Sequence, residues 1–251
     1  MKNVFHLVLF SLLVVSCTSE SKLDNGESKA PDQLNLSDRS CGSFSIEEIN
    51  LIGEKHNEYV IDWLQQLDCN SPDFMEDAMA TYRSLGKGEF NDNHIKEMTN
   101  DPRVTFAAED YAQQFNNPAT VGYYNQLMNL IDQSNDYASF VAGLTALQSQ
   151  VDSNLDCFDW SFMMTSISVA RKSAQLWTPV AAGGMGLAPC GTTGFSRIPW
   201  WKKAVRNDIA GAAGYFMAVG VGLTVPGANV AIAGSVAFAA GWSSAVGSLW
   251  D

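Results

Sequence analysis

The histidines are the side chains in this sequence with the most obvious catalytic chemistry, and two of them, His56 and His94, lie well inside the chain. His56 shares a helical face with Ile52 and Val60, and a histidine on such an apolar face is most often a hydrogen-bonded core residue. The alternative is a buried general base or metal ligand, for which Glu109 from another helix is the weak candidate partner. A hydrolase or metal enzyme around His56 is therefore one hypothesis.

His94 and Glu97 are three residues apart, so on a helix they would share a face as metal ligands do. The preceding stretch 91–93, Asn-Asp-Asn, is more typical of a cap or turn. The sequence has no nucleophile elbow, no two-histidine zinc helix and no phosphate-binding loop. We therefore expect no metal and no cofactor, and a non-catalytic protein is favoured over an enzyme.

The elements that must position these residues are helical. Ser45 followed by Glu48 forms a capping box that starts a helix, and further helix starts are indicated at Ser71, Asp101 and Pro118. No convincing alternation typical of strands occurs, so the predicted fold is an all-α multi-helix bundle. The segment 41–177 holds 20 Asp and Glu against 7 Lys and Arg. Such an acidic surface repels phosphate backbones and excludes nucleic acid as a partner.

The first sixteen residues have the features of an export signal, with Lys2 followed by a short apolar stretch. The stretch 13–17, Leu-Val-Val-Ser-Cys, resembles the lipobox of bacterial lipoproteins. By that resemblance Cys17 is lipidated and anchors the chain to a membrane of the cell envelope. The absence of Asp after Cys17 favours the outer membrane, and an ordinary cleaved signal peptide with a spare thiol is the alternative.

The remaining cysteines form an even set, which in an exported protein indicates disulfides. Cys41 and Cys69 flank the first helix, which would be roughly 33 Å long, whereas a disulfide needs Cα atoms within about 7 Å. We therefore expect Cys41 to pair with Cys157 or Cys190, and Cys69 to pair with the other.

The C-terminal stretch 208–251 carries charge only at its two ends, and Pro226-Gly227 divides it into two apolar segments. Small residues four apart would let two helices pack closely as a hairpin. The predicted ridges are Ala210, Gly214, Ala218 and Gly222 in the first arm, and Ala231, Ser235, Ala239, Ser243 and Gly247 in the second. A membrane-active hairpin, as in bacteriocins and pore-forming toxins, is an alternative to a core hairpin.

These features divide the chain into a signal peptide (1–16), a lipidated tether (17–40), an acidic helical body (41–177), a Gly-rich loop (178–198) and a helical hairpin (199–251) packed with the body. Three short motifs resemble uncharacterised exported proteins of flavobacteria-like organisms: Gly53 with His56 and Asn57, Ser168-Val169-Ala170-Arg171 with Trp177, and Trp200-Trp201-Lys202 before the hairpin. That resemblance implies no activity. The favoured function is a structural or partner-binding lipoprotein of the cell envelope, with a protein partner there.

Overall fold

Helices make up almost all of the regular structure in this computed structural model, which describes residues 44–101, 106–191, 199–220 and 229–249. All of these residues belong to one unit, 32–251. No strand occurs in the described ranges, so the fold is all-α as predicted. The predicted signal peptide, Cys17, the tether, Cys41 and Gly222 lie outside the described residues.

The α-helices are α1 Ile46–Gln66, α2 Phe74–Leu85, α3 Asp92–Met98, α4 Ala119–Gln133, α5 Tyr137–Asn154, α6 Cys157–Trp177, α7 Trp200–Gly220 and α8 Asn229–Ala245. The 3₁₀ helices are η1 Ala108–Gln114, η2 Val180–Ala182, η3 Pro189–Gly191 and η4 Gly247–Leu249.

The start of α1 shows how the local sequence fixes an element. The Ser45 hydroxyl accepts a hydrogen bond from the Glu48 amide (3.3 Å), and the Glu48 carboxylate accepts one from the Ser45 amide (2.7 Å). This is the predicted capping box, and it satisfies donors that a helix end otherwise leaves unpaired.

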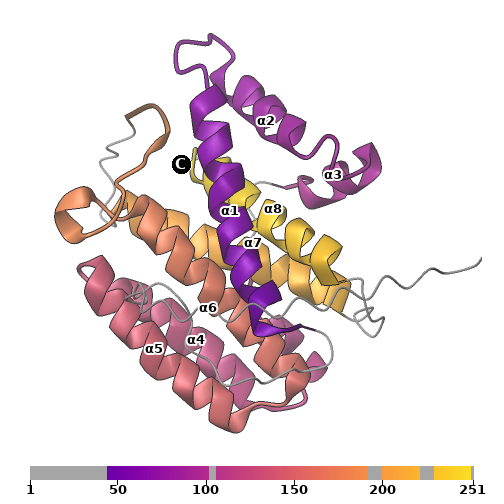
Figure 1. Cartoon of the computed structure of the whole chain (residues 1–251), viewed down its shortest axis with the longest axis vertical. Helices are drawn as coiled ribbons and strands as arrows, with labels where there is room; N and C mark the ends of the chain where they lie inside the picture. The colour runs from indigo at the N-terminus through magenta and orange to yellow at the C-terminus, as the bar shows by residue number, and fades with distance from the viewer. Residues whose placement is uncertain (1–43, 102–105, 192–198, 221–228, 250–251) are drawn as a thin grey trace, which may run out of the picture. The chain divides into compact units, whose positions relative to one another are not determined.

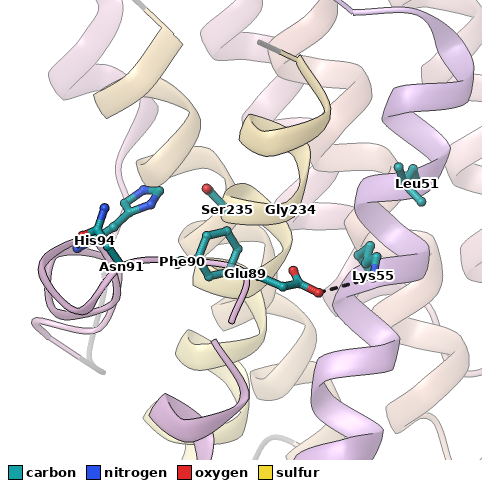
Figure 2. A pocket seen from close by; sticks show the side chains of 8 residues that line it. All are labelled: Leu51, Lys55, Glu89, Phe90, Asn91, His94, Gly234 and Ser235. Atoms are coloured by element: carbon teal, nitrogen blue, oxygen red, sulfur yellow. Dashed lines mark hydrogen bonds and ion pairs between the residues drawn. The ribbon is translucent and has the colours of Figure 1, made fainter. Parts of the chain in front are cut away.

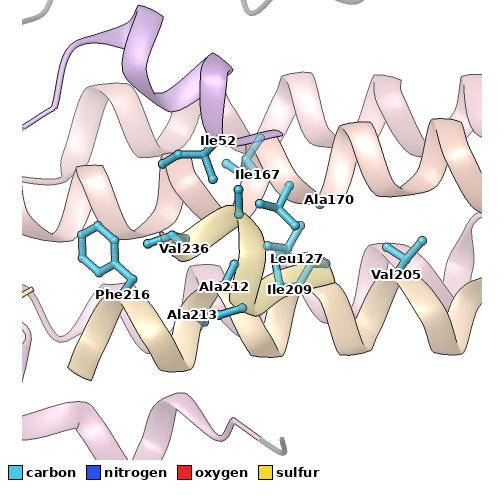
Figure 3. Close-up of a cluster of buried hydrophobic side chains, with 14 of the residues drawn as sticks. Ile52, Leu127, Ile167, Ala170, Val205, Ile209, Ala212, Ala213, Phe216 and Val236 are labelled. Carbon is cyan, nitrogen blue, oxygen red and sulfur yellow. The ribbon is translucent and has the colours of Figure 1, made fainter. Parts of the chain in front are cut away.

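Four helices surround the centre of the fold, and each packs against two of the others: α1 against α6 and α8, and α7 against the same two (Figure 1). Helices α4 and α5 pack beside α6, whereas α2 packs against α1 and α3 against α8. Each central helix contributes fully buried aliphatic side chains to one cluster (Figure 3). Examples are Ile52 from α1, Ile167 from α6, Ile209 from α7 and Val236 from α8.

Helices α7 and α8 approach closely at Gly211. A methyl group at Gly211 would lie 2.4 Å from the Ser243 hydroxyl oxygen and 2.8 Å from the Ala239 carbonyl oxygen. In α8 this contact therefore involves two residues of the predicted ridge. In α7 the contact is made by Gly211, which follows the predicted ridge residue Ala210 by one position and is not part of that ridge. Two other residues of the predicted ridge are not fully buried: Gly214 is half-buried and Ala218 is exposed. The shift is expected because α7 must pack against α6 as well as α8.

Three other residues of the predicted ridges are buried: Ala210, Ser235 and Gly247. Ala231 lies within α8. Among the described residues, no helix combines the length and apolar character that a transmembrane span requires.

The loop after α6 folds back onto the end of that helix instead of leading away from it. The Met185 amide donates to the Gln175 carbonyl and the Gly186 amide to the Thr178 carbonyl, each at 2.8 Å. These bonds satisfy carbonyl groups that have no partner within the last turn of a helix. Residues 185–187 of the predicted Gly-rich loop thus cap the end of α6.

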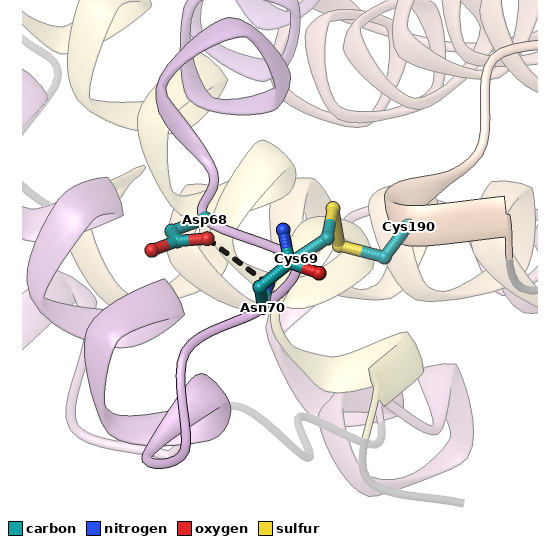
Figure 4. The surroundings of a disulfide bond; sticks show 4 residues. All are labelled: Asp68, Cys69, Asn70 and Cys190. Atoms are coloured by element: carbon teal, nitrogen blue, oxygen red, sulfur yellow. Dashed lines mark hydrogen bonds between the residues drawn. A yellow bond between two sulfur atoms is a disulfide. The ribbon is translucent and has the colours of Figure 1, made fainter.

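A disulfide joins this loop to the connection between α1 and α2 (Figure 4). It links Cys69 to Cys190, with Cα atoms 5.3 Å apart, and it is one of the two pairings predicted for Cys69. Cys157 is also in a disulfide. The bond between Cys69 and Cys190 connects positions 121 residues apart in the sequence.

Candidate functional site

His56 lies in the interior, where its imidazole meets a carboxylate from α7. Its Nε2 is 2.8 Å from Oδ1 of Asp208, and both side chains are 0% exposed. The ring N–H is not aimed closely at that oxygen, so the contact is an ion pair and not a well-directed hydrogen bond. Nδ1 lies 2.9 Å from Oδ1 of Asn57. Oxygen atoms therefore face both ring nitrogens, an arrangement that suits the doubly protonated ring.

The charge of His56 depends on two opposing effects. Burial lowers the pKa of His56 because the charged ring loses its hydration, whereas the nearby Asp208 carboxylate and the hydrogen-bond partners raise it. The second effect is the larger, so the pKa of His56 lies above its ordinary value of 6.5. The raised pKa favours the protonated imidazolium form of His56 opposite Asp208.

The other oxygen of Asp208 binds helix α6. The Trp177 indole N–H donates to Oδ2 over 2.9 Å, and the Ser173 hydroxyl donates to the same oxygen. On α1, the Asn57 side-chain amide donates to the Lys172 carbonyl at 3.0 Å. The resulting network, His56, Asn57, Ser173, Trp177 and Asp208, joins α1, α6 and α7 in the middle of the fold.

A close approach of α1 to α6 permits this network. A methyl group at Gly53 would lie 2.7 Å from the Ser168 hydroxyl oxygen and 2.9 Å from the Ser168 carbonyl oxygen. The Ser168 hydroxyl in turn donates to the Ile49 carbonyl (2.8 Å). Two segments that are distant in the sequence, one around Gly53 and one around Ser168, thus meet at a single helix crossing.

The geometry of this network is that of a structural charge pair. The Ser173 hydroxyl is directed to Asp208 and not to His56, so His56 has no serine nucleophile to activate there. Glu109, the partner considered for His56, lies on the surface and accepts a hydrogen bond from Asn125 (2.7 Å). The carboxylate that meets His56 comes instead from Asp208, because α7 packs into the centre while η1 lies at the periphery.

His94 lies in a different place, on the wall of a groove of about 470 Å³ (Figure 2). Three segments form the groove: α1, the chain from Glu89 into α3, and α8. Its lining consists of Leu51, Lys55, Glu89, Phe90, Asn91, His94, Gly234 and Ser235. Pockets of this size are typical of small-molecule sites.

The two sides of the groove each carry a hydrogen-bonded pair. On one side, Nε2 of His94 contacts the Tyr215 hydroxyl. On the other, the Tyr59 hydroxyl donates to Oε2 of Glu89. Burial, together with the adjacent Glu89 carboxylate, raises the pKa of Tyr59 well above its ordinary value, so this hydroxyl stays protonated. The groove therefore offers fixed polar groups beside the ring of Phe90.

Lys55 links the groove to the acidic surface of α1. Its Nζ is 3.2 Å from a Glu58 oxygen and 3.7 Å from Oε1 of Glu89. Burial lowers the pKa of Lys55, but the two carboxylates outweigh that effect and raise it. Two carboxylates thus surround one ammonium group, which leaves this side of the groove with an excess of negative charge.

Within the described ranges, no group of three or more His, Cys, Asp or Glu side chains is arranged to hold a metal ion. His94 contacts Tyr215, and Glu97, its predicted partner, is exposed and is not among the residues that line the groove.

Sequence reasoning missed Asp208 as the partner of His56, although a signal was present. Asp208 is the only acidic residue between Trp200 and Trp250, and a lone carboxylate at the start of a long apolar stretch requires a cation or several donors if it is buried. The groove had no comparable signal, because its residues come from three separate segments.

No protein-family model, no curated protein and no solved structure matches this chain. The resemblances to lipoproteins and to exported flavobacterial proteins therefore remain predictions.

Proposed function

We propose that the chain is a lipid-anchored, non-catalytic protein of the cell envelope that binds a partner through the groove between α1, α8 and the segment entering α3. The groove is the observation that carries the proposal, because polar groups from three elements converge there in reach of solvent. His56, by contrast, is 0% exposed and paired with Asp208. The anchoring half of the proposal is supported by the lipobox-like stretch that ends at Cys17.

The groove can be blocked selectively at Gly234. A methyl group there would lie 3.7 Å from the Phe90 ring and 3.9 Å from the Tyr59 hydroxyl, which are ordinary contacts. Gly234→Ala should therefore leave the groove open, whereas Gly234→Leu should fill it. The two variants differ in side-chain size at one position of one helix.

Photo-cross-linking in cells tests the binding half. A photoreactive residue at Leu51, inside the groove, should yield a discrete adduct in the Gly234→Ala background and lose it in the Gly234→Leu background. The same residue at Gln113, an exposed position on η1, is the control and should not yield that adduct. An adduct that forms equally from both positions, or that survives Gly234→Leu, would contradict the proposal.

Fractionation tests the anchoring half. The wild-type chain should sediment with membranes, and Cys17→Ser should release it, because the lipid is attached through that sulfur. Equal membrane association of both proteins would show that Cys17 is not the anchor.

A further inference from the structure

We propose that the groove receives an alkylammonium group, either a free amine or a lysine side chain, with Glu89 as the anion that binds it. This inference rests on the proposed partner-binding role of the groove and names the chemistry of the partner.

The carboxylate of Glu89 has an acceptor oxygen to spare. Its Oε2 accepts from the Tyr59 hydroxyl, whereas Oε1, among the described residues, makes only the 3.7 Å ion pair with Lys55, which is too long for a hydrogen bond. Lys55 itself is hydrogen-bonded to Glu58. The Glu89 side chain is 46% exposed, so an ammonium group entering the groove can reach Oε1.

The carboxylate is also held in position before any ligand arrives. Tyr59 is only 4% exposed, and its ring packs edge-on against Phe238 with centroids 5.2 Å apart. Its hydroxyl therefore fixes the orientation of the Glu89 carboxylate from the buried side of that group. A preorganised acceptor loses less entropy on binding than a freely rotating one.

The remainder of the groove suits the hydrocarbon part of such a ligand. Phe90 and Leu51 provide apolar surface, and Gly234 has no side chain to fill the floor. Methylene groups can pack there while the ammonium group meets Glu89, and the Phe90 ring is a further favourable neighbour for a cation.

Charge decides between cationic and anionic ligands. The cation at this side of the groove, Lys55, already faces two carboxylates, Glu58 and Glu89. The whole chain has a formal net charge of −12. The field of the protein therefore favours approach of a cation and disfavours an anion.

Three probes with the same carbon chain separate the possibilities: n-pentylammonium, pentanol and pentanoate. Each is titrated into the ¹⁵N-labelled chain carrying Cys17→Ser, and the amide signals of Phe90, Asn91 and Gly234 are followed by NMR. Pentylammonium should shift these signals with saturation, and the other two should not.

Two substitutions then change the affinity in opposite directions. Glu89→Gln should weaken pentylammonium binding about tenfold, since a charge-assisted hydrogen bond is lost. Lys55→Met should strengthen it, because the competing cation is removed. Glu109→Gln is the matched control, with the same change in net charge at a surface site on η1, and should leave the affinity unchanged.

A lysine tripeptide and its norleucine counterpart identify the source of the amine. If the lysine peptide binds and the norleucine peptide does not, the group is assigned to a protein partner. If pentylammonium binds and neither peptide does, the group is assigned to a small solute. Either result supports the inference. Equal binding of pentanol or pentanoate, or an unchanged affinity in Glu89→Gln, overturns it and leaves the groove as a binding site for another ligand. No shift with any probe, in the wild-type or Lys55→Met background, overturns both the inference and the proposed binding role.

Discussion

Adding one methyl group at Gly211 or Gly241 should destabilise the fold, because both glycines lie where another helix approaches closely. At Gly241 the added carbon would be 2.2 Å from the Tyr82 hydroxyl oxygen and 3.0 Å from a Val60 methyl group. The Tyr82 hydroxyl donates to the Phe238 carbonyl at 3.0 Å, so moving the ring would cost that bond. At Gly211 the obstacle includes a backbone carbonyl of α8, which cannot rotate away.

The expected magnitude follows from a comparison with Gly122 in α4, where an added methyl group would have no neighbour within 4 Å. Gly→Ala in a helix interior stabilises by up to about 1 kcal/mol at such an open site. The same gain applies at Gly211 and Gly241, so it cancels when the sites are compared. The remaining difference is the cost of overpacking, about 1–3 kcal/mol. For a chain of this size that corresponds to roughly 2–12 °C in melting temperature.

Urea denaturation measures the free energy of unfolding of each variant, with helix content followed by circular dichroism at 222 nm. Gly122→Ala should be as stable as wild type or more stable. Gly211→Ala should be less stable than Gly122→Ala by about 1–3 kcal/mol, the cost of overpacking. Adding Ser243→Gly to Gly211→Ala should recover part of the loss, because Ser243 provides the nearest atom. If Gly211→Ala were as stabilising as Gly122→Ala, α7 and α8 would not be in the tight contact described above.

Two further predictions concern the buried charge pair and the disulfide. Asp208→Asn should cost about 3–5 kcal/mol, since it leaves the fully buried His56 without its counter-ion. Because the pKa of His56 is higher in the folded chain than its ordinary 6.5, the pair stabilises fully below about pH 6.5 and loses this effect as pH rises through the folded pKa. The free energy of unfolding of wild type should thus fall above that pH, and a slope unchanged in His56→Gln would contradict the assignment. Replacing Cys69 and Cys190 together by serine should cost about 2–5 kcal/mol in denaturant titrations, with the single and double variants equal.

Local signals in the sequence predicted the all-α class and some of the helix starts, but the start expected at Ser71 was wrong, since α2 is preceded by Asp73 and begins at Phe74. Ser45 and Glu48 form the capping box where it was expected, and α4 begins at Ala119 directly after Pro118. The stretch after Asp101 was expected to be helical, but the next described element there is η1, a 3₁₀ helix beginning at Ala108. A capping signal is contained in neighbouring residues, whereas the type of helix that follows depends on what it packs against.

The candidate site was less predictable because it depends on contacts between distant segments. His56 was correctly placed on the apolar face of α1. Its partner, the carboxylate of Asp208, lies 152 positions further along the chain, and no sequence spacing links the two residues. His94 was noted for its spacing to Glu97, but in the fold it contacts Tyr215 of α7. Residues brought together by tertiary packing leave no periodic pattern to detect.

The central position of α1 has a consequence for how the chain acquires its structure. The apolar face of α1, which begins at Ile46, packs against α6 and α8, and α8 ends at Ala245. Among the described helices, α1 is the first to be synthesised, and its inner face is fully covered only after α8, which lies 163 positions beyond the end of α1, has been made. Contacts of such long sequence separation slow folding, so a chain that lacked α8 would leave the inner face of α1 open to chaperones and proteases.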